Sequence, residues 1–210
     1  MILQATVMKY IPTNAYFYID NETKHGFLID PGAQADKLLA MIRDKGFVIE
    51  RILLTHGHFD HIGAVEKIRQ ALSIPVCMQA NGRAYAENPV WNLSAQTGTP
   101  ITLPEVTYLP DYSTISLDAS PACDLTLIPV PGHTTDGAMY YTKKDGVAFV
   151  GDSIFQGSYG RTDMYGGDEA TLLQNIREKI LTLPDETILL SGHSAPTTVR
   201  DEKDCPFYRS

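Results

Sequence analysis

Cysteine is scarce in this chain of 210 residues, and no two cysteines have the spacing of a disulfide framework or a thiolate metal site. Cys77, Cys123 and Cys205 lie far apart and form no CxxC pair. Disulfide-rich domains and cysteine-type zinc sites need clustered cysteines. We therefore expect buried or incidental thiols on which the fold does not depend.

Long apolar runs and a leader-like N-terminus are also missing. No run approaches the roughly 20 apolar residues that a membrane-spanning helix requires. The chain begins Met1-Ile2-Leu3, without the basic segment and following apolar stretch of a signal peptide. We expect a cytoplasmic protein with no membrane partner.

An excess of basic residues is absent as well. The chain has 17 Lys and Arg against 25 Asp and Glu, a net charge of -8, and no basic cluster longer than Lys143-Lys144. Nucleic-acid binding needs a basic surface that neutralises phosphates. The charge argues against a nucleic-acid partner and leaves a small molecule as the expected one.

The sequence does contain the material of one globular core. Hydrophobic residues make up 43% of the chain, and its length suits a single domain over residues 1–210. Periodicity and turn residues predict strands at 3–8, 16–19, 26–29, 48–54, 76–78, 125–130, 138–142, 147–150 and 187–190, and helices at 35–45, 62–72 and 169–181. This alternation is typical of the α/β (α+β) class, in which helices and sheets form layers.

Residues 81–121 interrupt the regular pattern. They contain five prolines and the only tryptophan, Trp91. We expect loops here, with a short helix or a hairpin. Because long irregular insertions in compact domains are often functional, this segment is a candidate for the substrate side of a site.

Histidine is concentrated in one segment. Three of the six histidines, His56, His58 and His61, fall within six positions, with Asp60 among them. Imidazole and carboxylate are preferred ligands of zinc and related metals. Alternate residues of an extended segment point the same way, so His56 and His58 can share one metal, and Asp60 and His61 can reach a second. His25 stands alone, and we expect a structural or surface role for it.

Other predicted strands also lead directly into polar residues. His133 and His193 each follow a strand, and Asp152 follows another. Loops at strand ends commonly carry functional side chains. These three residues can complete two metal sites, with Asp152 as a bridge. Nitrogen and oxygen ligands with an open position favour a hydrolytic over a structural zinc site.

The motifs, taken in order, resemble those of the metallo-β-lactamase superfamily. Residues 56–61 resemble its HxHxDH motif, and the later motifs correspond to residues 131–134, 151–153 and 192–193. The closer resemblance is to small glyoxalase II-like hydrolases. It is carried by GSYGRTD and GGD within residues 157–168 and by the ending SGHSAPTT.

This resemblance implies a four-layer αββα sandwich with the metals at one edge of the two sheets. It implies two divalent ions, Zn²⁺ in the first place, with iron or manganese as alternatives. Asp60 and Asp152 would act in catalysis as well as in ligation. The implied ligands are His56, His58 and His133 for one metal, Asp60, His61 and His193 for the other, and Asp152 as the bridge.

The resemblance also implies thioester hydrolysis, as of S-lactoylglutathione, by a metal-bound hydroxide. Arg161 is expected either to grip a carboxylate of the thiol carrier or to pair with a nearby aspartate. Tyr159 is expected to line the pocket. Asp30 is expected either to orient a ligand histidine or to serve as a plain turn residue.

Some features depart from that family. We expect no C-terminal helical domain of the kind with which larger glyoxalase II enzymes bind glutathione, because only about 17 residues follow His193, and this leaves the thiol carrier open. Asp136 and Ser194 stand where relatives have glycine. Three alternatives remain: a mono-iron persulfide dioxygenase, a lactonase or other ester hydrolase including a β-lactamase, and a non-catalytic binding module. A secreted β-lactamase should carry a signal peptide, and a binding module should have lost ligands.

Overall fold

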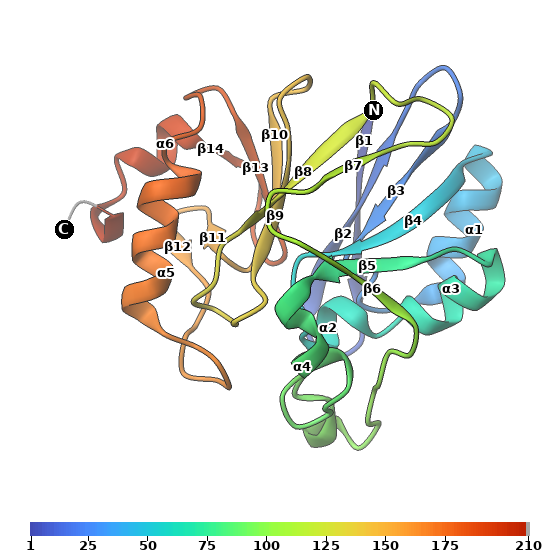
Figure 1. Cartoon of the computed structure of the whole chain (residues 1–210), viewed down its shortest axis with the longest axis horizontal. Helices are drawn as coiled ribbons and strands as arrows, with labels where there is room; N and C mark the ends of the chain where they lie inside the picture. The colour runs from blue at the N-terminus through green and yellow to red at the C-terminus, as the bar shows by residue number, and fades with distance from the viewer. Residues whose placement is uncertain (209–210) are drawn as a thin grey trace.

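Two six-stranded sheets lie face to face, with helices on both outer faces (Figure 1). The computed structural model describes residues 1–208. Three clusters of buried apolar side chains hold the layers together, one between the sheets and one under each helical layer. The predicted four-layer αββα sandwich is confirmed.

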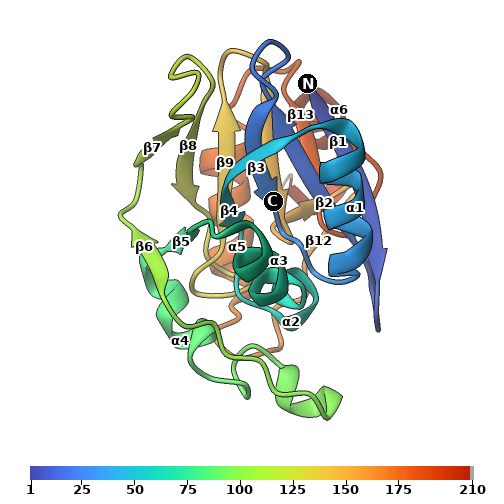
Figure 2. The ribbon, with the colours of Figure 1, turned by 90° about the vertical axis from the view of Figure 1, so that its right-hand side faces the viewer.

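The first sheet has the order β1-β2-β3-β4-β5-β6. Its strands β1 and β2 pair antiparallel, as do β2 and β3, and the rest are parallel. The strands span Ile2–Met8, Pro12–Ile19, His25–Ile29, Val48–Leu54, Val76–Gln79 and Val106–Leu109. Helices α1 (Ala35–Lys45) and α3 (Val65–Leu72) cover its outer face (Figure 2). They do so because each helix has an apolar stripe, with Leu38 and Ile42 buried on α1 and Val65 and Ile68 buried on α3.

The second sheet has the order β14-β13-β10-β9-β8-β7. In chain order, β7, β8, β9, β10, β13 and β14 span Thr114–Ser116, Asp124–Pro129, Ala138–Thr142, Val147–Gly151, Ile188–Ser191 and Thr197–Thr198. Helix α5 (Glu169–Asn175) continues as a π-helical turn over Ile176–Ile180 and packs on its outer face with α6 (Val199–Lys203). Asp168 caps α5 by accepting a hydrogen bond from the Thr171 amide at 2.7 Å.

Short elements connect the layers around one edge of the sandwich. Helices α2 and α4 span Phe59–Ile62 and Arg83–Ala86, and strands β11 (Ile154–Phe155) and β12 (Ser158–Tyr159) form a small ribbon. Single 3₁₀ turns occupy Ala80–Gly82, Ser94–Thr97 and Pro206–Tyr208. Within residues 1–208, no helix is both long and apolar enough to cross a membrane.

The short helix expected within residues 81–121 is confirmed as α4. The same residues also hold two strands that do not form a hairpin, because β6 completes the first sheet and β7 lies at the edge of the second.

One predicted helix needs correction. The helix predicted at 62–72 begins at Val65 and is preceded by α2. The break at residues 63–64 follows from tertiary contact: the Ala64 amide donates to the Pro31 carbonyl at 2.9 Å, and a Cβ on Gly63 would lie 2.3 Å from the Gly32 carbonyl oxygen.

Candidate metal centre

Four strand ends from both sheets meet at the edge of the sandwich near α2. β4 leads into His56 and His58, and α2 then carries Asp60 and His61. From the second sheet, β8, β10 and β13 lead into His133, Asp152 and His193. The structure thus brings together all seven residues that the sequence singled out as ligands. They are called the ligand cluster below.

One half of the ligand cluster consists of three buried histidines. The ring nitrogens of His56, His58 and His133 lie within 4.8 Å of one another. The Nδ1 atom of His58 is 3.0 Å from Nε2 of His133, with the two rings edge-on. This half is a three-nitrogen site.

The other half combines histidine with carboxylate. Asp60, His61 and His193 place their ligand atoms within 4.8 Å of one another. The Nε2 atom of His193 is 3.1 Å from Oδ2 of Asp60 and 3.1 Å from Oδ2 of Asp152. Oδ1 of Asp152 lies 3.3 Å from Nε2 of His61, and Oδ2 lies 3.7 Å from Nε2 of His133. Asp152 therefore lies between the two halves, where a bridging ligand would be.

Outer contacts hold the histidine rings in place. The Nδ1 atoms of His61, His133 and His193 each lie close to a different oxygen atom, at 3.0, 2.6 and 2.7 Å respectively. Each of these atoms is a carboxylate or backbone carbonyl oxygen, which accepts hydrogen bonds but cannot donate them. Nδ1 must then be the donor, so Nε2 is the ring atom that faces the centre and would bind a metal ion once it carries no proton. The acceptors are Asp30 Oδ2, the Arg161 carbonyl and the Pro12 carbonyl.

Asp30 connects this outer layer to the first sheet. Its Oδ1 accepts from the Thr55 amide at 2.8 Å, and its Oδ2 accepts from the Thr55 hydroxyl at 2.6 Å and faces His61. Asp30 has a φ of 50° and is almost fully buried. A plain turn residue would need none of these bonds, so the geometry favours the orienting role.

The donor set fits divalent metal ions. Among the described residues, the buried atoms His56 Nε2, His61 Nε2 and Asp152 Oδ1 have no hydrogen-bond partner. Buried polar atoms are normally paired, so unpaired nitrogen and oxygen atoms gathered around one centre fit the role of metal ligands. Tetrahedral zinc with bonds of about 2.1 Å separates its ligands by about 3.4 Å. The distances here, 3.0 to 3.8 Å, agree with that value.

The electrostatics of the cluster favour a cation at its centre. Burial, with His133 nearby, lowers the pKa of His58 to about 3, so this imidazole is neutral. Burial opposes charge on His193, but the carboxylates of Asp152 and Asp60 outweigh it and raise the pKa of His193 to about 10. A proton on His193 balances the carboxylates, and a metal ion would displace it.

A cavity of about 670 Å³ opens beside the cluster. It reaches five ligand residues, namely His58, Asp60, His133, Asp152 and His193, and the neutral polar side chains Gln96 and Thr97. Its remaining lining is Arg161 and six large apolar side chains, called the apolar wall below: Tyr10, Ile11, Phe59, Leu93, Phe155 and Met164. The expected substrate-side segment therefore contributes through Leu93, Gln96 and Thr97.

The turn between β1 and β2 belongs to both the wall and the cluster. The Tyr10 hydroxyl donates to the Thr97 carbonyl at 3.1 Å, and its ring packs edge-on against Phe59. Two residues later, the Pro12 carbonyl faces His193 at 2.7 Å, and the Thr13 hydroxyl lies 3.4 Å from Oδ2 of Asp60. No sequence pattern predicted these contacts, because they are made by backbone or by ordinary residues of the turn and of the start of β2.

The two predicted substrate contacts differ in position. Arg161 lines the cavity, and its Nε and Nη2 atoms both donate to Asp163 at 2.7 Å. Tyr159 does not line it: its hydroxyl donates to Glu169 at 2.5 Å, and its ring packs against Phe207. The placement of Tyr159 in the pocket was therefore wrong, because β12 turns this ring toward the C-terminal segment.

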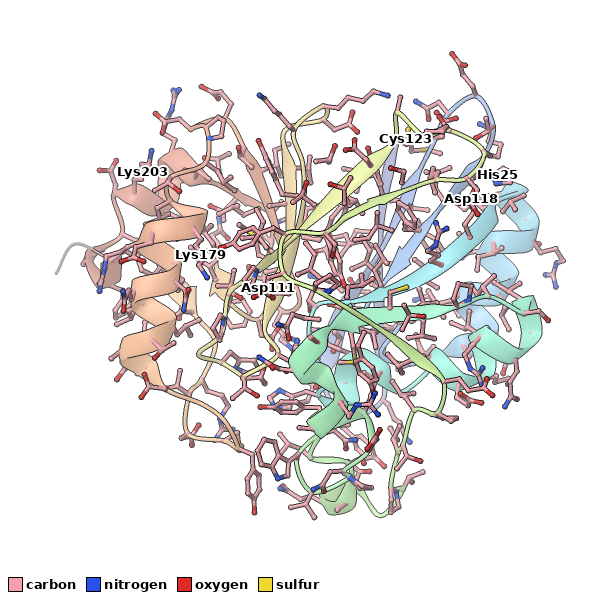
Figure 3. The ribbon with its side chains drawn as sticks, viewed as in Figure 1. His25, Asp111, Asp118, Cys123, Lys179 and Lys203 are labelled. Atoms are coloured by element: carbon pink, nitrogen blue, oxygen red, sulfur yellow. The ribbon has the colours of Figure 1, made fainter. Side chains whose placement is uncertain are left out.

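The remaining histidine, His25, lies elsewhere. Figure 3 shows it near Asp118 at the upper right, away from α2. Its Nδ1 is 2.7 Å from Oε1 of Glu50, whose other oxygen accepts from the Asp118 amide. His25 begins β3 and pairs with Val48 at the start of β4, so it occupies the end of the strands opposite the cluster.

Comparison with known proteins agrees with this geometry. The family model described as the metallo-beta-lactamase superfamily matches residues 9–193. The chain belongs to the metallo-β-lactamase superfamily.

Individual relatives refine this assignment. Hydroxyacylglutathione hydrolase GloC of Haemophilus influenzae is 31% identical over 97% of this chain and 98% of its own length. The BLEG-1 B3 metallo-β-lactamase has a TM-score of 0.92 at 38% identity, covering 100% of both chains. TTHA1623 in a di-iron-bound form has a TM-score of 0.84 at 32% identity, covering 98% of this chain and 99% of its own. The chain is thus similar to glyoxalase II-like members of the superfamily.

Proposed function

We propose that this chain is a binuclear metal-dependent hydrolase of thioesters. The observation that carries the proposal is the position of Asp152 between two complete donor groups at the base of one cavity. A site for a single iron held by two histidines and one aspartate would leave the other donors buried and without a partner. Because seven ligand residues meet here and a single iron would use only three of them, the ligand cluster favours the binuclear hydrolase over the dioxygenase.

Each of the two ions would have its own set of ligand residues. His56, His58 and His133 would hold one, and Asp60, His61 and His193 the other, with Asp152 shared. Bound there, two divalent cations would lower the pKa of a water molecule and polarise a substrate carbonyl. Zinc is our first choice, and iron or manganese suits the same donors. The di-iron form of TTHA1623 supports keeping iron open.

The chain itself supplies orientation and a dry environment. The acceptors at Nδ1 keep each ring in one tautomer, with Nε2 toward the centre. The apolar wall would exclude bulk water from a bound substrate, which strengthens electrostatic contacts at the carbonyl. A thiolate is a good leaving group, so thioester cleavage does not require a general acid in addition to the ligand residues that line the cavity.

The relatives support two hydrolytic reactions. Similarity to GloC supports a thioester substrate, and similarity to BLEG-1 favours β-lactam hydrolysis as a second candidate. Both reactions need the same attack on a carbonyl. They differ in the leaving group, because a β-lactam nitrogen needs a proton and a thiolate does not.

The test is hydrolysis by the purified, metal-analysed protein. Substrates are S-lactoylglutathione, a lactoyl thioester of benzyl mercaptan, and a chromogenic cephalosporin, with oxygen uptake followed in parallel. We expect thioester turnover with about two metal ions per chain. Turnover of the cephalosporin alone would favour the second candidate. Oxygen consumption with one iron per chain would contradict hydrolysis.

A further inference from the structure

The cavity beside the ligand cluster is mainly apolar. Apart from ligands, its lining is the apolar wall, two neutral polar side chains and Arg161. Tyr10 and Ile11, at the turn between β1 and β2, are 50% and 44% exposed. Large exposed apolar side chains grouped around a cavity are characteristic of ligand-binding grooves. The polar tip of Tyr10 is already bonded to the Thr97 carbonyl, so Tyr10 offers mainly its ring.

Outside the ligand cluster and the ions that it would hold, positive charge among the residues that line this cavity is limited to one neutralised group. Arg161 is the single Lys or Arg among the lining residues, and it donates twice to Asp163. Lys9 lies close by, with Nζ 5.1 Å from the centre of the Tyr10 ring, but it lines a smaller neighbouring depression. A thiol carrier such as glutathione presents two carboxylates, which bind best to unpaired guanidinium or ammonium groups. The cavity supplies no such group.

We propose that the preferred substrate is a thioester whose thiol part is uncharged and apolar, and that the apolar wall binds this part. The inference rests on the proposed thioester hydrolysis and identifies the class of carrier. In the reaction, water oxygen forms a bond to the acyl carbon as the carbon–sulfur bond breaks. The products are a carboxylate, the neutral thiol and one proton, so no oxidant or reductant is required.

The first experiment compares two thioesters with the same acyl group. The kcat/KM of the metal-loaded enzyme is measured for the lactoyl thioesters of benzyl mercaptan and of glutathione. We expect the benzyl thioester to be preferred by about tenfold or more, since apolar contacts in a pocket discriminate on this scale. Equal values, or a preference for the glutathione thioester, would overturn the inference while leaving thioester hydrolysis intact.

A binding measurement separates this inference from the proposed function. If neither thioester is hydrolysed, the proposed function fails. Calorimetry then measures whether the cavity binds a neutral apolar ligand more tightly than a charged one. The probes are benzyl methyl sulfide and S-methylglutathione, which share a thioether and differ in charge. Tighter binding of the neutral probe supports an apolar cavity, and tighter binding of the charged probe contradicts it.

A charge variant sharpens the comparison. Ile11→Lys adds a cation at an exposed position of the wall and should shift the ratio of the two kcat/KM values toward glutathione by about tenfold. Met8→Lys is the matched control, because Met8 is 54% exposed near the same turn but does not line the cavity. An unchanged ratio in Ile11→Lys, or an equal shift in both variants, would contradict binding at the wall.

Discussion

The ligand cluster and the apolar wall adjoin the same cavity but are built differently. Most of the cluster is buried, and its histidines are held by bonds to Asp30, to the Arg161 carbonyl and to the Pro12 carbonyl. The wall lies mostly on loops and on the short elements α2 and β11, its outer residues Tyr10 and Ile11 are about half exposed, and its bond from Tyr10 to Thr97 is on the surface. The difference implies that the cluster determines the chemistry and the wall determines which molecule enters.

This contrast follows from where the residues lie in the fold. The cluster is positioned by strand ends from two packed sheets, which leave little freedom for a ligand to shift. The wall comes from the β1–β2 turn, from Phe59 at the start of α2, from the segment after α4 and from the segment around β11 and β12. Loops tolerate substitution better than the elements that they connect. Variants of the cluster should therefore have larger effects than variants of the wall.

The largest effect is expected at the centre of the cluster. Asp152→Ala removes the carboxylate between the two donor groups, so we expect loss of at least one metal ion per chain and a fall in hydrolysis of at least about 10³-fold. Metal analysis and thioester turnover measure both. Asp118→Ala is the control, since this aspartate is exposed and lies at the far end of the sandwich. Full activity in Asp152→Ala would refute the bridging role.

A smaller effect is expected in the outer layer of the cluster. Asp30→Asn removes the charge that holds His61, and Thr55→Val removes a hydroxyl bonded to Asp30. Loss of such partners commonly costs about 10- to 100-fold in metal affinity. We expect that loss for Asp30→Asn and a lesser one for Thr55→Val, measured by competition with a chelator. Unchanged affinity in Asp30→Asn would show that packing alone positions His61.

Asp136, behind the cluster, provides a test by pH. Burial raises the pKa of Asp136 to about 7, against an ordinary value of 3.8. Between these values the folded state binds more protons than the unfolded state, so stability falls as pH rises from about 4 to about 7 and then levels off. Asp136→Asn should remove this loss. Urea denaturation of both metal-free proteins at several pH values measures the free energy of unfolding. If this free energy changed with pH in the same way in the two proteins, the carboxyl of Asp136 would not be buried in its uncharged form.

The smallest effect is expected at the wall. Tyr10→Phe keeps the ring beside Phe59 and loses one hydrogen bond to Thr97, which is worth about 0.5–1.5 kcal/mol. We expect KM to rise by less than about tenfold, with kcat and metal content unchanged. Tyr112→Phe is the matched control on an exposed tyrosine. A fall in kcat with KM constant would show that the turn acts through His193 rather than through the wall.

The same contrast explains what the sequence could reveal. The ligand cluster is formed by residue types with a strong chemical meaning, placed directly after predicted strands, so its members could be named in advance. The alternation of strands and helices predicted the layered α/β class, whereas the four-layer sandwich was implied by the resemblance to the superfamily. Backbone acceptors such as the Pro12 and Arg161 carbonyls leave no trace in residue type.

The loops were harder to predict for a physical reason. Tyr159 belongs to a segment with a family-like sequence, but its ring direction is set by packing against Phe207. Strand β6 is four residues long and is stabilised mainly by pairing with β5. Short strands of this kind depend on tertiary contacts rather than on local pattern.

We propose that two metal ions at the ligand cluster act together in hydrolysis. Metal-free protein is titrated with zinc, and thioester hydrolysis is followed against the equivalents of zinc added. We predict a rate that rises until about two ions per chain are bound and then stays constant. A rate that is complete at one ion per chain, with a second ion adding nothing, would contradict it.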